Sequence, residues 1–340
     1  MTVLGEWTAR LRRHALALAA CAAALLPAAQ PARALVEKDV IVPEDALAFE
    51  IATFHEEQLL AFDRTGRLRH LKRYLLPDRI TRNETEGTIS RTVTDVHLNL
   101  TYGISDTWNL FVGLPYRMLE QESTLTTASD RGTTLSDVQD LQSQTLSGAG
   151  DLAVTMLHRT VFSDRNGLVL GYGITHPMQD RSESDPGLVA LALRSPNPTI
   201  NGFVHYTHYP QIERARFDLR FEYGTGLPGK IEITRGKRVQ YRSGSGLRAE
   251  TGWFQEIGRV GVGVSYEEFA QAQSRLSGVG NSDPEKESLL HFRIGYGNLT
   301  DLEQGPVTQP YQLMLTVDRS LRGFNVPYSD GYTLSLLLFF

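Results

Sequence analysis

The sequence predicts an all-β fold: a transmembrane antiparallel up-and-down β-barrel of about 12 strands, with short periplasmic turns and long outer loops. From about residue 46 to the end, segments of about ten residues alternate between apolar and polar side chains. Tyr or Trp stands at the end of many apolar stripes, and the connections alternate between short and long. A soluble β-sandwich would also alternate, so the aromatic ends and the loop lengths favour the membrane barrel.

Length and composition exclude several classes of protein. The chain has 340 residues, of which 41% are hydrophobic and 21% are charged, so it is neither disordered nor a bundle of membrane helices. After the first 35 residues no stretch approaches 18 uninterrupted apolar positions. The net charge of -5 makes a nucleic-acid partner a poor expectation.

Residues 1–34 form a separate segment with the pattern of a secretory signal peptide. Three arginines, Arg10, Arg12 and Arg13, precede the apolar run "ALALAACAAALLPAA", and "ARA" at residues 32–34 fits a cleavage site. We therefore expect export and a mature start at Leu35, with cleavage after Ala29 as an alternative. "LAAC", which ends at Cys21, also fits a lipoprotein cleavage site, although the apolar run continues beyond it.

Cys21 is the only cysteine, so the predicted mature chain has none. Disulfides, thiolate chemistry and cysteine metal sites are thereby excluded, and we expect no cofactor and no metal. Residues 1–34 hold four arginines and one glutamate, so the remaining chain carries a net charge of -8.

Residues 35–45 are expected to form a periplasmic N-terminal segment, and residues 46–340 the outer-membrane barrel. The 12 expected strands are 46–56, 92–103, 108–120, 147–161, 167–178, 199–209, 213–224, 243–255, 259–270, 287–298, 309–319 and 329–340. The short links fall near 104–107, 163–167 and 256–259, and the long ones near 63–91, 121–146, 179–197 and 271–286. An even strand number places both termini on the periplasmic side. The first and sixth strands are the least well defined, and "LLAFDRTGRLRHLKRYLL" in the first long loop could instead form an amphipathic helix.

The C-terminal strand "GYTLSLLLFF" has an apolar side that ends in an aromatic residue. Its outward-facing residues would be Tyr332, Leu334, Leu336, Leu338 and Phe340. In a closed barrel the last strand pairs with the first and leaves no edge. This ending resembles the C-terminal assembly signal of bacterial outer-membrane barrels, which implies outer-membrane lipid and the outer-membrane assembly machinery as partners.

Three motifs resemble a known family. "YGISDTWNLFVGLPY" (102–116), "SGAGDLAVTMLHR" (147–159) and "DRSLRGFNVPYSDGYTLSLLLFF" (318–340) are similar to outer-membrane transporters grouped with the meta-pathway of phenol degradation. The likeness spans most of residues 46–340. One departure is "THPMQD" (175–180), where the family often has Leu-Pro-Thr-Gly. The resemblance implies an outer-membrane channel for hydrophobic or aromatic compounds.

Charged residues recur on the side of the strands opposite the apolar stripes. Burying them in a bilayer would cost a few kcal/mol each, so they must face water or one another. The candidate lumen-lining residues are Arg117, Arg159, Arg216, Asp218, Arg220, Glu222, Arg248, Glu250, Glu267, Arg293 and Asp318. They could form a paired plug, in which Asp218, Arg220 and Glu222 bridge Arg248 and Glu250, or they could line a selective aqueous path. This mixture of charges fits a polar solute as readily as an aromatic one.

Three short motifs point to enzymes or metal sites but lack the context these require. "GTGLPGKI" (224–231) nearly matches a phosphate-binding loop, but Ile231 replaces the required hydroxyl and no helix pattern follows. In "HYTH", His205 and His208 should lie on opposite faces of a strand and so cannot share a metal. "SGSG" (243–246) lacks the context of a nucleophile elbow, so a catalytic residue is not expected.

The sequence thus predicts an outer-membrane channel for small solutes. The alternative is a closed barrel whose outer loops serve adhesion, scaffolding or envelope assembly, and a barrel hydrolase is a remote third hypothesis.

Overall fold

The structure is a computed structural model. It describes residues 41–70, 72–74, 86–127, 143–163, 165–178, 197–210, 215–234, 237–257, 259–276, 280–281, 284–297 and 310–340. The expected signal peptide and most of the segment 35–45 lie outside the described residues.

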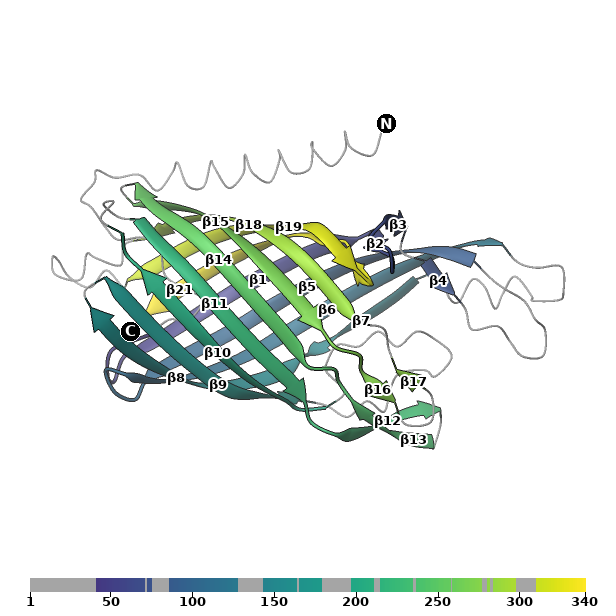
Figure 1. The fold of residues 1–340 in the computed structure, drawn as a ribbon, viewed down its shortest axis with the longest axis horizontal. Helices are drawn as coiled ribbons and strands as arrows, with labels where there is room; N and C mark the ends of the chain where they lie inside the picture. Colours follow the sequence, from purple (N-terminus) through teal and green to yellow (C-terminus); the bar gives the residue numbers. More distant parts are fainter. Residues whose placement is uncertain are drawn as a thin grey trace. The chain divides into compact units, whose positions relative to one another are not determined.

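The long strands form one closed antiparallel β-barrel (Figure 1). They are β1 (Leu47–Gln58), β5 (Glu86–Gly103), β6 (Trp108–Thr127), β7 (Ser143–Ala149) continued by β8 (Asp151–Ser163), β9 (Asn166–Pro177), β10 (Thr199–His208), β11 (Ala215–Gly226), β14 (Gly246–Ile257), β15 (Val260–Gln271), β18 (Glu285–Gly297), β19 (Tyr311–Phe324) and β21 (Asp330–Phe339). Each pairs with the next along the chain, and β1 also pairs with β21. With β7 and β8 counted as one wall strand, this confirms the expected up-and-down barrel, including its first and sixth strands.

The first and last strands close the barrel through their ends. The Phe340 N–H donates to the Leu47 carbonyl at 2.8 Å, and the Leu47 N–H donates to the Phe340 carbonyl at 3.1 Å. The register then runs from Ala48 opposite Phe339 to Glu57 opposite Asp330. Such closure leaves no strand edge exposed along this seam.

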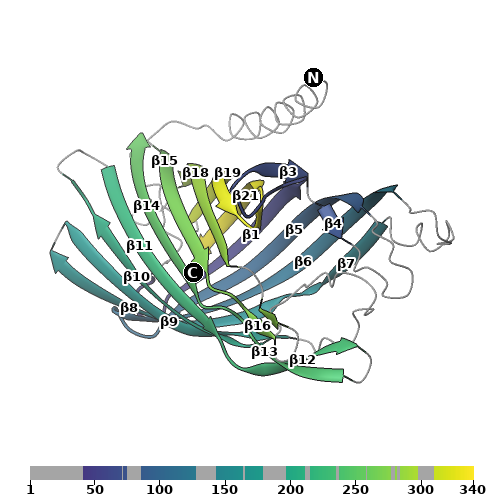
Figure 2. The ribbon, with the colours of Figure 1, turned by 45° about the vertical axis from the view of Figure 1, so that its right-hand side comes forward.

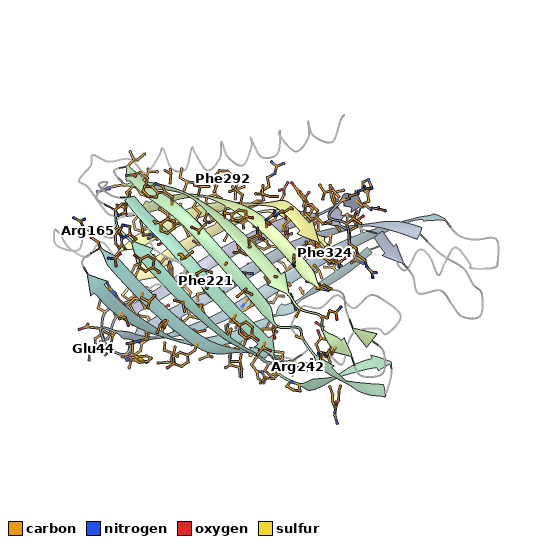
Figure 3. All side chains as sticks on the ribbon, in the orientation of Figure 1. Glu44, Arg165, Phe221, Arg242, Phe292 and Phe324 are labelled. Atoms are coloured by element: carbon orange, nitrogen blue, oxygen red, sulfur yellow. The ribbon has the colours of Figure 1, made fainter. Side chains whose placement is uncertain are left out.

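The outer surface of the barrel is apolar and its interior is polar. Phe221 and Phe292 project from the outer face of the wall (Figure 3) and are 47% and 50% exposed. On the inward side, Asn109, Ser265 and Glu267 are at most 3% exposed. A water-soluble fold would have the opposite arrangement, so this outer face is suited to lipid. Within the described ranges no helix has the length and apolarity needed to cross a membrane.

Eight short strands lie at one end of the barrel or beside its longest strands. They are β2 (Leu60–Phe62), β3 (Leu68–His70), β4 (Lys72–Tyr74), β12 (Gly229–Thr234), β13 (Lys237–Arg242), β16 (Arg275–Leu276), β17 (Gly280–Asn281) and β20 (Val326–Pro327). The strands β12, β13, β16 and β17 make a separate four-stranded sheet, which extends beyond the end of the barrel (Figure 2). β20, β2 and β3 make a second small sheet, and β4 pairs with β5.

The amphipathic helix considered for the first long loop is wrong for its described residues, which include the strands β2, β3 and β4. Asp63 explains the turn between β2 and β3, because its Oδ1 accepts hydrogen bonds from Thr65 N (2.7 Å), Thr65 Oγ1 (2.6 Å) and Arg67 N (3.1 Å). Gly66 adopts φ of 74°, a conformation that glycine tolerates best. The expected loops 63–91 and 121–146 are also shorter than predicted, since β5 begins at Glu86, β6 ends at Thr127 and β7 begins at Ser143. Beyond the bilayer the backbone can keep pairing without any apolar alternation to signal it.

Candidate functional site

The barrel encloses a cavity of about 800 Å³ to which every wall strand contributes side chains. Nine of the eleven expected lumen residues border it; the other two, Arg117 and Arg159, do not. Arg117 instead makes a bidentate pair with Asp95, at 2.7 Å from Nε and 2.6 Å from Nη2. Arg159 is exposed, and its N–H donates to the Thr107 carbonyl in a tight turn. The cavity itself is thus lined mainly as the alternation predicts.

One wall of the cavity, formed by β10, β11, β14, β15 and β18, carries arginines stacked on phenylalanine rings. The Arg220 guanidinium lies 4.1 Å from the centre of the Phe203 ring. Arg216 and Arg293 lie 4.7 and 5.3 Å from the Phe254 ring. Such cation–π contacts hold each guanidinium group against its ring. We call this the arginine wall: Arg216, Arg220, Arg248 and Arg293 with Phe203, Phe254 and Phe269.

Glycines on neighbouring strands make room for two of these rings. A Cβ atom at Gly171 would lie 2.1 Å from the Phe203 ring, and a Cβ atom at Gly263 would lie 2.2 Å from the Phe254 ring. Each ring therefore rests against bare backbone, which keeps it close to the barrel wall. The sequence shows these glycines, but it does not show which rings cover them.

Carboxylates neutralise the arginine wall. Arg216 Nε lies 2.9 Å from Asp218, Arg220 Nη2 lies 3.3 Å from Glu222, Arg248 Nε lies 3.2 Å from Glu267, and Arg293 Nη2 lies 2.6 Å from Glu250. The expected bridge from Glu222 to Arg248 is wrong, although the two residues are opposite each other in register. Glu222 pairs along its own strand and Arg248 pairs across to β15, because each guanidinium follows the ring on which it stacks.

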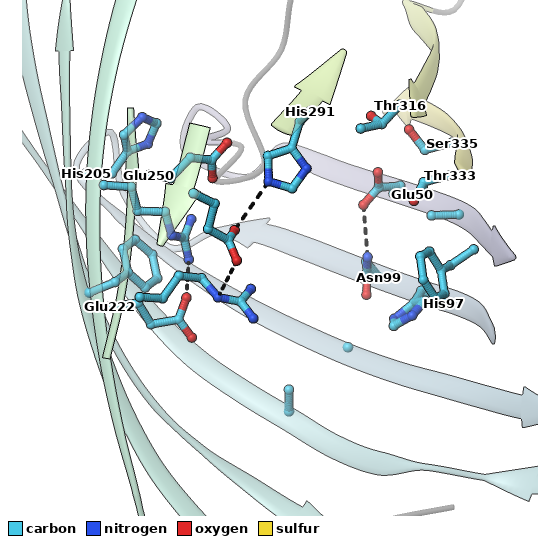
Figure 4. A pocket seen from close by; sticks show the side chains of 18 of the residues that line it. Glu50, His97, Asn99, His205, Glu222, Glu250, His291, Thr316, Thr333 and Ser335 are labelled. Atoms are coloured by element: carbon cyan, nitrogen blue, oxygen red, sulfur yellow. Dashed lines mark hydrogen bonds and ion pairs between the residues drawn. The ribbon is translucent and has the colours of Figure 1, made fainter. Parts of the chain in front are cut away.

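Two buried histidines extend this network. His291 Nδ1 lies 2.6 Å from Asp318 and its Nε2 lies 3.6 Å from Glu267, while His205 Nε2 lies 3.5 Å from Asp218. Figure 4 shows both histidines at the cavity. His208 does not border the cavity and contacts Asn166 Oδ1 at 2.8 Å. The two histidines of "HYTH" therefore do not share a site. Across the described chain no three His, Cys, Asp or Glu side chains are grouped to hold a metal ion.

The opposite wall has a different chemistry. Glu50, Asn99, His97, Thr316, Thr333 and Ser335 gather there (Figure 4). Asn99 Nδ2 donates to Glu50 Oε2 at 2.9 Å. We call this group the hydroxyl–amide wall. It carries one carboxylate, one side-chain amide, one imidazole and three hydroxyl groups, and it contains no arginine.

Val42 lies inside the barrel at the end where Leu47 and Phe340 pair, whereas residues 43–45 are exposed. Val42 is 0% exposed and packs against the inward side chains of Ala48 and Leu337. Its N–H donates to Asn109 Oδ1 at 3.1 Å, and its carbonyl accepts from Asn109 Nδ2 at 2.9 Å. Of the described residues of the expected periplasmic segment 35–45, Val42 is thus inside the barrel and 43–45 are exposed.

Gly103 is the sequence feature that permits this entry. A Cβ atom there would lie 1.8 Å from the Pro43 carbonyl oxygen. Sequence reasoning missed this contact, because a glycine at the end of a strand also suits an ordinary turn.

The enzyme-like motifs fall outside the cavity. "GTGLPGKI" spans the end of β11 and the start of β12, so a strand follows it instead of a helix. In "SGSG", Ser243 Oγ contacts the Tyr241 hydroxyl at 3.4 Å and Ser245 Oγ contacts Thr225 Oγ1 at 3.0 Å. Neither arrangement supplies a base for a serine nucleophile.

Comparison with known proteins places the fold. No family model matches the sequence, and no curated protein does. An outer-membrane channel from Pseudomonas putida F1 has a similar structure, with a TM-score of 0.64, 13% identity, and coverage of 90% of this chain and 100% of that chain. A deletion mutant of the monoaromatic hydrocarbon channel TodX (TM-score 0.41, 9% identity, 88% and 91% coverage) and the β domain of the Bordetella autotransporter BrkA (TM-score 0.40, 14% identity, 86% and 99% coverage) are too distant to support an argument. The chain therefore shares the barrel fold of a solved outer-membrane channel.

Proposed function

We propose that the protein is a bacterial outer-membrane channel that lets small solutes cross, with aromatic or hydrophobic compounds among its candidate cargo. The observation that carries the proposal is a cavity of about 800 Å³, lined by charged, polar and aromatic side chains, inside a barrel with an apolar outer face. A barrel serving only as an anchor would fill its interior with side chains, as small eight-stranded barrels do. Here the stacked arginines and phenylalanines lie along the wall and leave the middle open.

The proposed cargo follows from the chemistry of the arginine wall. Phe203 and Phe254 border the cavity and offer ring surfaces next to polar groups, and such a lining suits solutes with an apolar body. The motif resemblance to transporters of the phenol-degradation meta-pathway agrees with this cargo. The charged and hydroxyl side chains would orient such solutes and keep the path hydrated.

Location and biogenesis belong to the same proposal. Residues 1–34 would direct export and be cleaved, and the outward face of β21, with Tyr332, Leu334, Leu336, Leu338 and Phe340, would be recognised by the outer-membrane assembly machinery. The pairing of Phe340 with Leu47 supports this, because it makes the terminal strand the one that completes the seam.

The test is conductance and solute flux of the purified protein in lipid. We expect discrete current steps in planar bilayers, and swelling of liposomes in a small aromatic solute. Deletion of the gene should also slow uptake of that solute by cells. A folded protein that gives no current and no swelling, in a strain whose uptake is unaffected by the deletion, would refute the proposal.

A second candidate function is supported by the four-stranded sheet β12–β13–β16–β17 beyond the barrel end. A folded sheet outside the membrane offers a surface for a scaffolding or adhesive contact. Replacing residues 229–242 with a short Gly-Ser linker separates the two functions. Loss of a partner without change in conductance would favour scaffolding, and altered conductance alone would favour the channel.

A further inference from the structure

Carboxylates outnumber arginines around the cavity. Its lining includes four arginines and no lysine, against the seven carboxylates of Glu50, Asp151, Asp218, Glu222, Glu250, Glu267 and Asp318. With its histidines neutral, the lining therefore has three negative charges in excess. A water-filled path bounded by a low-dielectric wall concentrates ions of the opposite sign.

Most of these carboxylates are committed to a basic neighbour. Asp218, Glu222, Glu250 and Glu267 each pair with an arginine, and Asp318 pairs with His291. Asp151 lies close enough to Arg117 to interact with it electrostatically. The arginines in turn stack on rings, so neither sign of charge in these pairs is free to meet a solute.

Glu50 differs from the other carboxylates. Its one polar partner among the described residues is the neutral amide of Asn99 at 2.9 Å. It lies on the hydroxyl–amide wall, and its half-buried carboxylate borders the cavity (Figure 4). Hydroxyl and amide oxygens beside a carboxylate are the acceptors that an ammonium ion or a partly hydrated metal cation needs.

The position of Glu50 makes this charge decisive for transit. Its register partner on β21 is Leu337, which packs with Val42 and Ala48 inside the barrel. A solute leaving the cavity toward Val42 must pass the Glu50 carboxylate at short range. The arginine wall is separated from this point by the width of the cavity.

We propose that the lumen selects small cations, including protonated amines, over anions, and that Glu50 is the residue that sets this preference. The inference rests on the proposed channel function and defines its cargo further. A unit charge about 6 Å from a permeating ion in a water-like dielectric changes the occupancy of that ion about threefold. Attraction of cations and repulsion of anions act together, so one carboxylate suffices for a measurable selectivity.

The experiment measures reversal potentials of the purified protein in planar bilayers under a potassium chloride gradient. At about 0.1 M salt the Debye length of about 10 Å roughly halves this interaction, so each ion's occupancy changes about twofold. Because cation attraction and anion repulsion multiply, we expect a K⁺/Cl⁻ permeability ratio of about three or more. Glu50→Gln should lower the ratio about threefold, and Glu50→Asp should preserve it. The matched control is Glu57→Gln, because Glu57 lies an odd number of positions away on β1 and so faces outward. It should leave the ratio unchanged.

A flux assay tests the same inference without any substitution. Liposomes that contain the native protein should swell faster in benzylammonium than in benzoate, two probes that share a ring and differ in the sign of their charge. A cation-to-anion ratio at or below one, in permeability or in swelling rate, overturns the inference but leaves the channel function standing. So does a ratio that is equal in the Glu50→Gln and native proteins. Absence of current and swelling in every variant overturns the channel itself and the selectivity with it.

Discussion

Asn109 holds Val42 inside the barrel, and its replacement by alanine should release Val42. Asn109 is 0% exposed and makes both a donated and an accepted hydrogen bond with the Val42 backbone. In Asn109→Ala the buried Val42 N–H and carbonyl would each lose a partner, at about 1–3 kcal/mol per group. Burial of the Val42 side chain stabilises its place inside the barrel by about 1.5–3 kcal/mol. The two unpaired backbone groups together cost about 2–6 kcal/mol, which matches or exceeds that stabilisation. Val42 should therefore leave the interior, and the space that its side chain fills should become open to ions.

The assay combines single-channel conductance with labelling of a cysteine at position 42. Conductance should rise in Asn109→Ala, and a water-soluble maleimide should modify Val42→Cys faster in that background than in the native one. Asn201→Ala is the matched control, since Asn201 also borders the cavity but makes no contact with Val42. Equal labelling rates and equal conductance in the two backgrounds would refute the role of Asn109.

Three further predictions concern stability. Gly171→Val should crowd the Phe203 ring, because the nearest ring atom would lie 2.1 Å from the new Cβ. The free energy of unfolding, measured in detergent, should fall by about 1–3 kcal/mol, and adding Phe203→Ala should recover part of that loss. Arg248→Met should destabilise the barrel by about 1–3 kcal/mol, because Glu267 is 2% exposed and its carboxylate loses its arginine partner. The 40% exposure of the Arg248 side chain limits the effect. If the double variant Arg248→Met/Glu267→Gln is no more stable than Arg248→Met alone, this account is contradicted. The Thr65 hydroxyl and the backbone N–H groups of Arg67 and Thr65 lower the pKa of Asp63 from 3.8 to about 2. The stabilisation that Asp63 gives the β2–β3 turn should therefore be complete above about pH 4 and be lost as the pH falls toward about 2. Hydrogen exchange at residues 64–67 should show this pH dependence in the native protein and not in Asp63→Asn.

The sequence was sufficient to predict the barrel because a bilayer imposes a strict alternation. Each wall strand must turn apolar residues toward lipid, as Leu98 and Phe292 do, so sidedness and strand number can be read from the pattern. Where the bilayer ends, that constraint ends as well. The extensions of β5, β6 and β7 and the hairpin β12–β13 were therefore missed, since backbone pairing there needs no periodic side chains.

The interior was predicted in outline but not in its partnerships. Alternation placed Arg216, Arg220, Arg248 and Arg293 inside, since it depends only on the parity of each position. Partner choice depends on the tilt and stagger of neighbouring strands and on the rings, which alternation does not encode. Glu50 was not among the expected lumen residues, because the first strand, 46–56, is one of the two that the sequence defines least well. The sequence did not predict that Val42 lies inside the barrel, because residues 41–46 show no alternation of apolar and polar side chains.

The placement of Phe203 and Phe254 on glycine has a consequence for the bore of the channel. A ring that lies flat against the wall projects into the lumen only by its own thickness. The width of the lumen beside Phe203 and Phe254 is therefore governed by the backbone positions behind them, Gly171 and Gly263, which a passing molecule need never touch. Redesigning the pore for bulkier or slimmer cargo should therefore begin behind the rings. Larger residues at these covered positions would tilt the phenylalanine rings toward the lumen and narrow it, and they would leave every charged side chain of the lining unchanged.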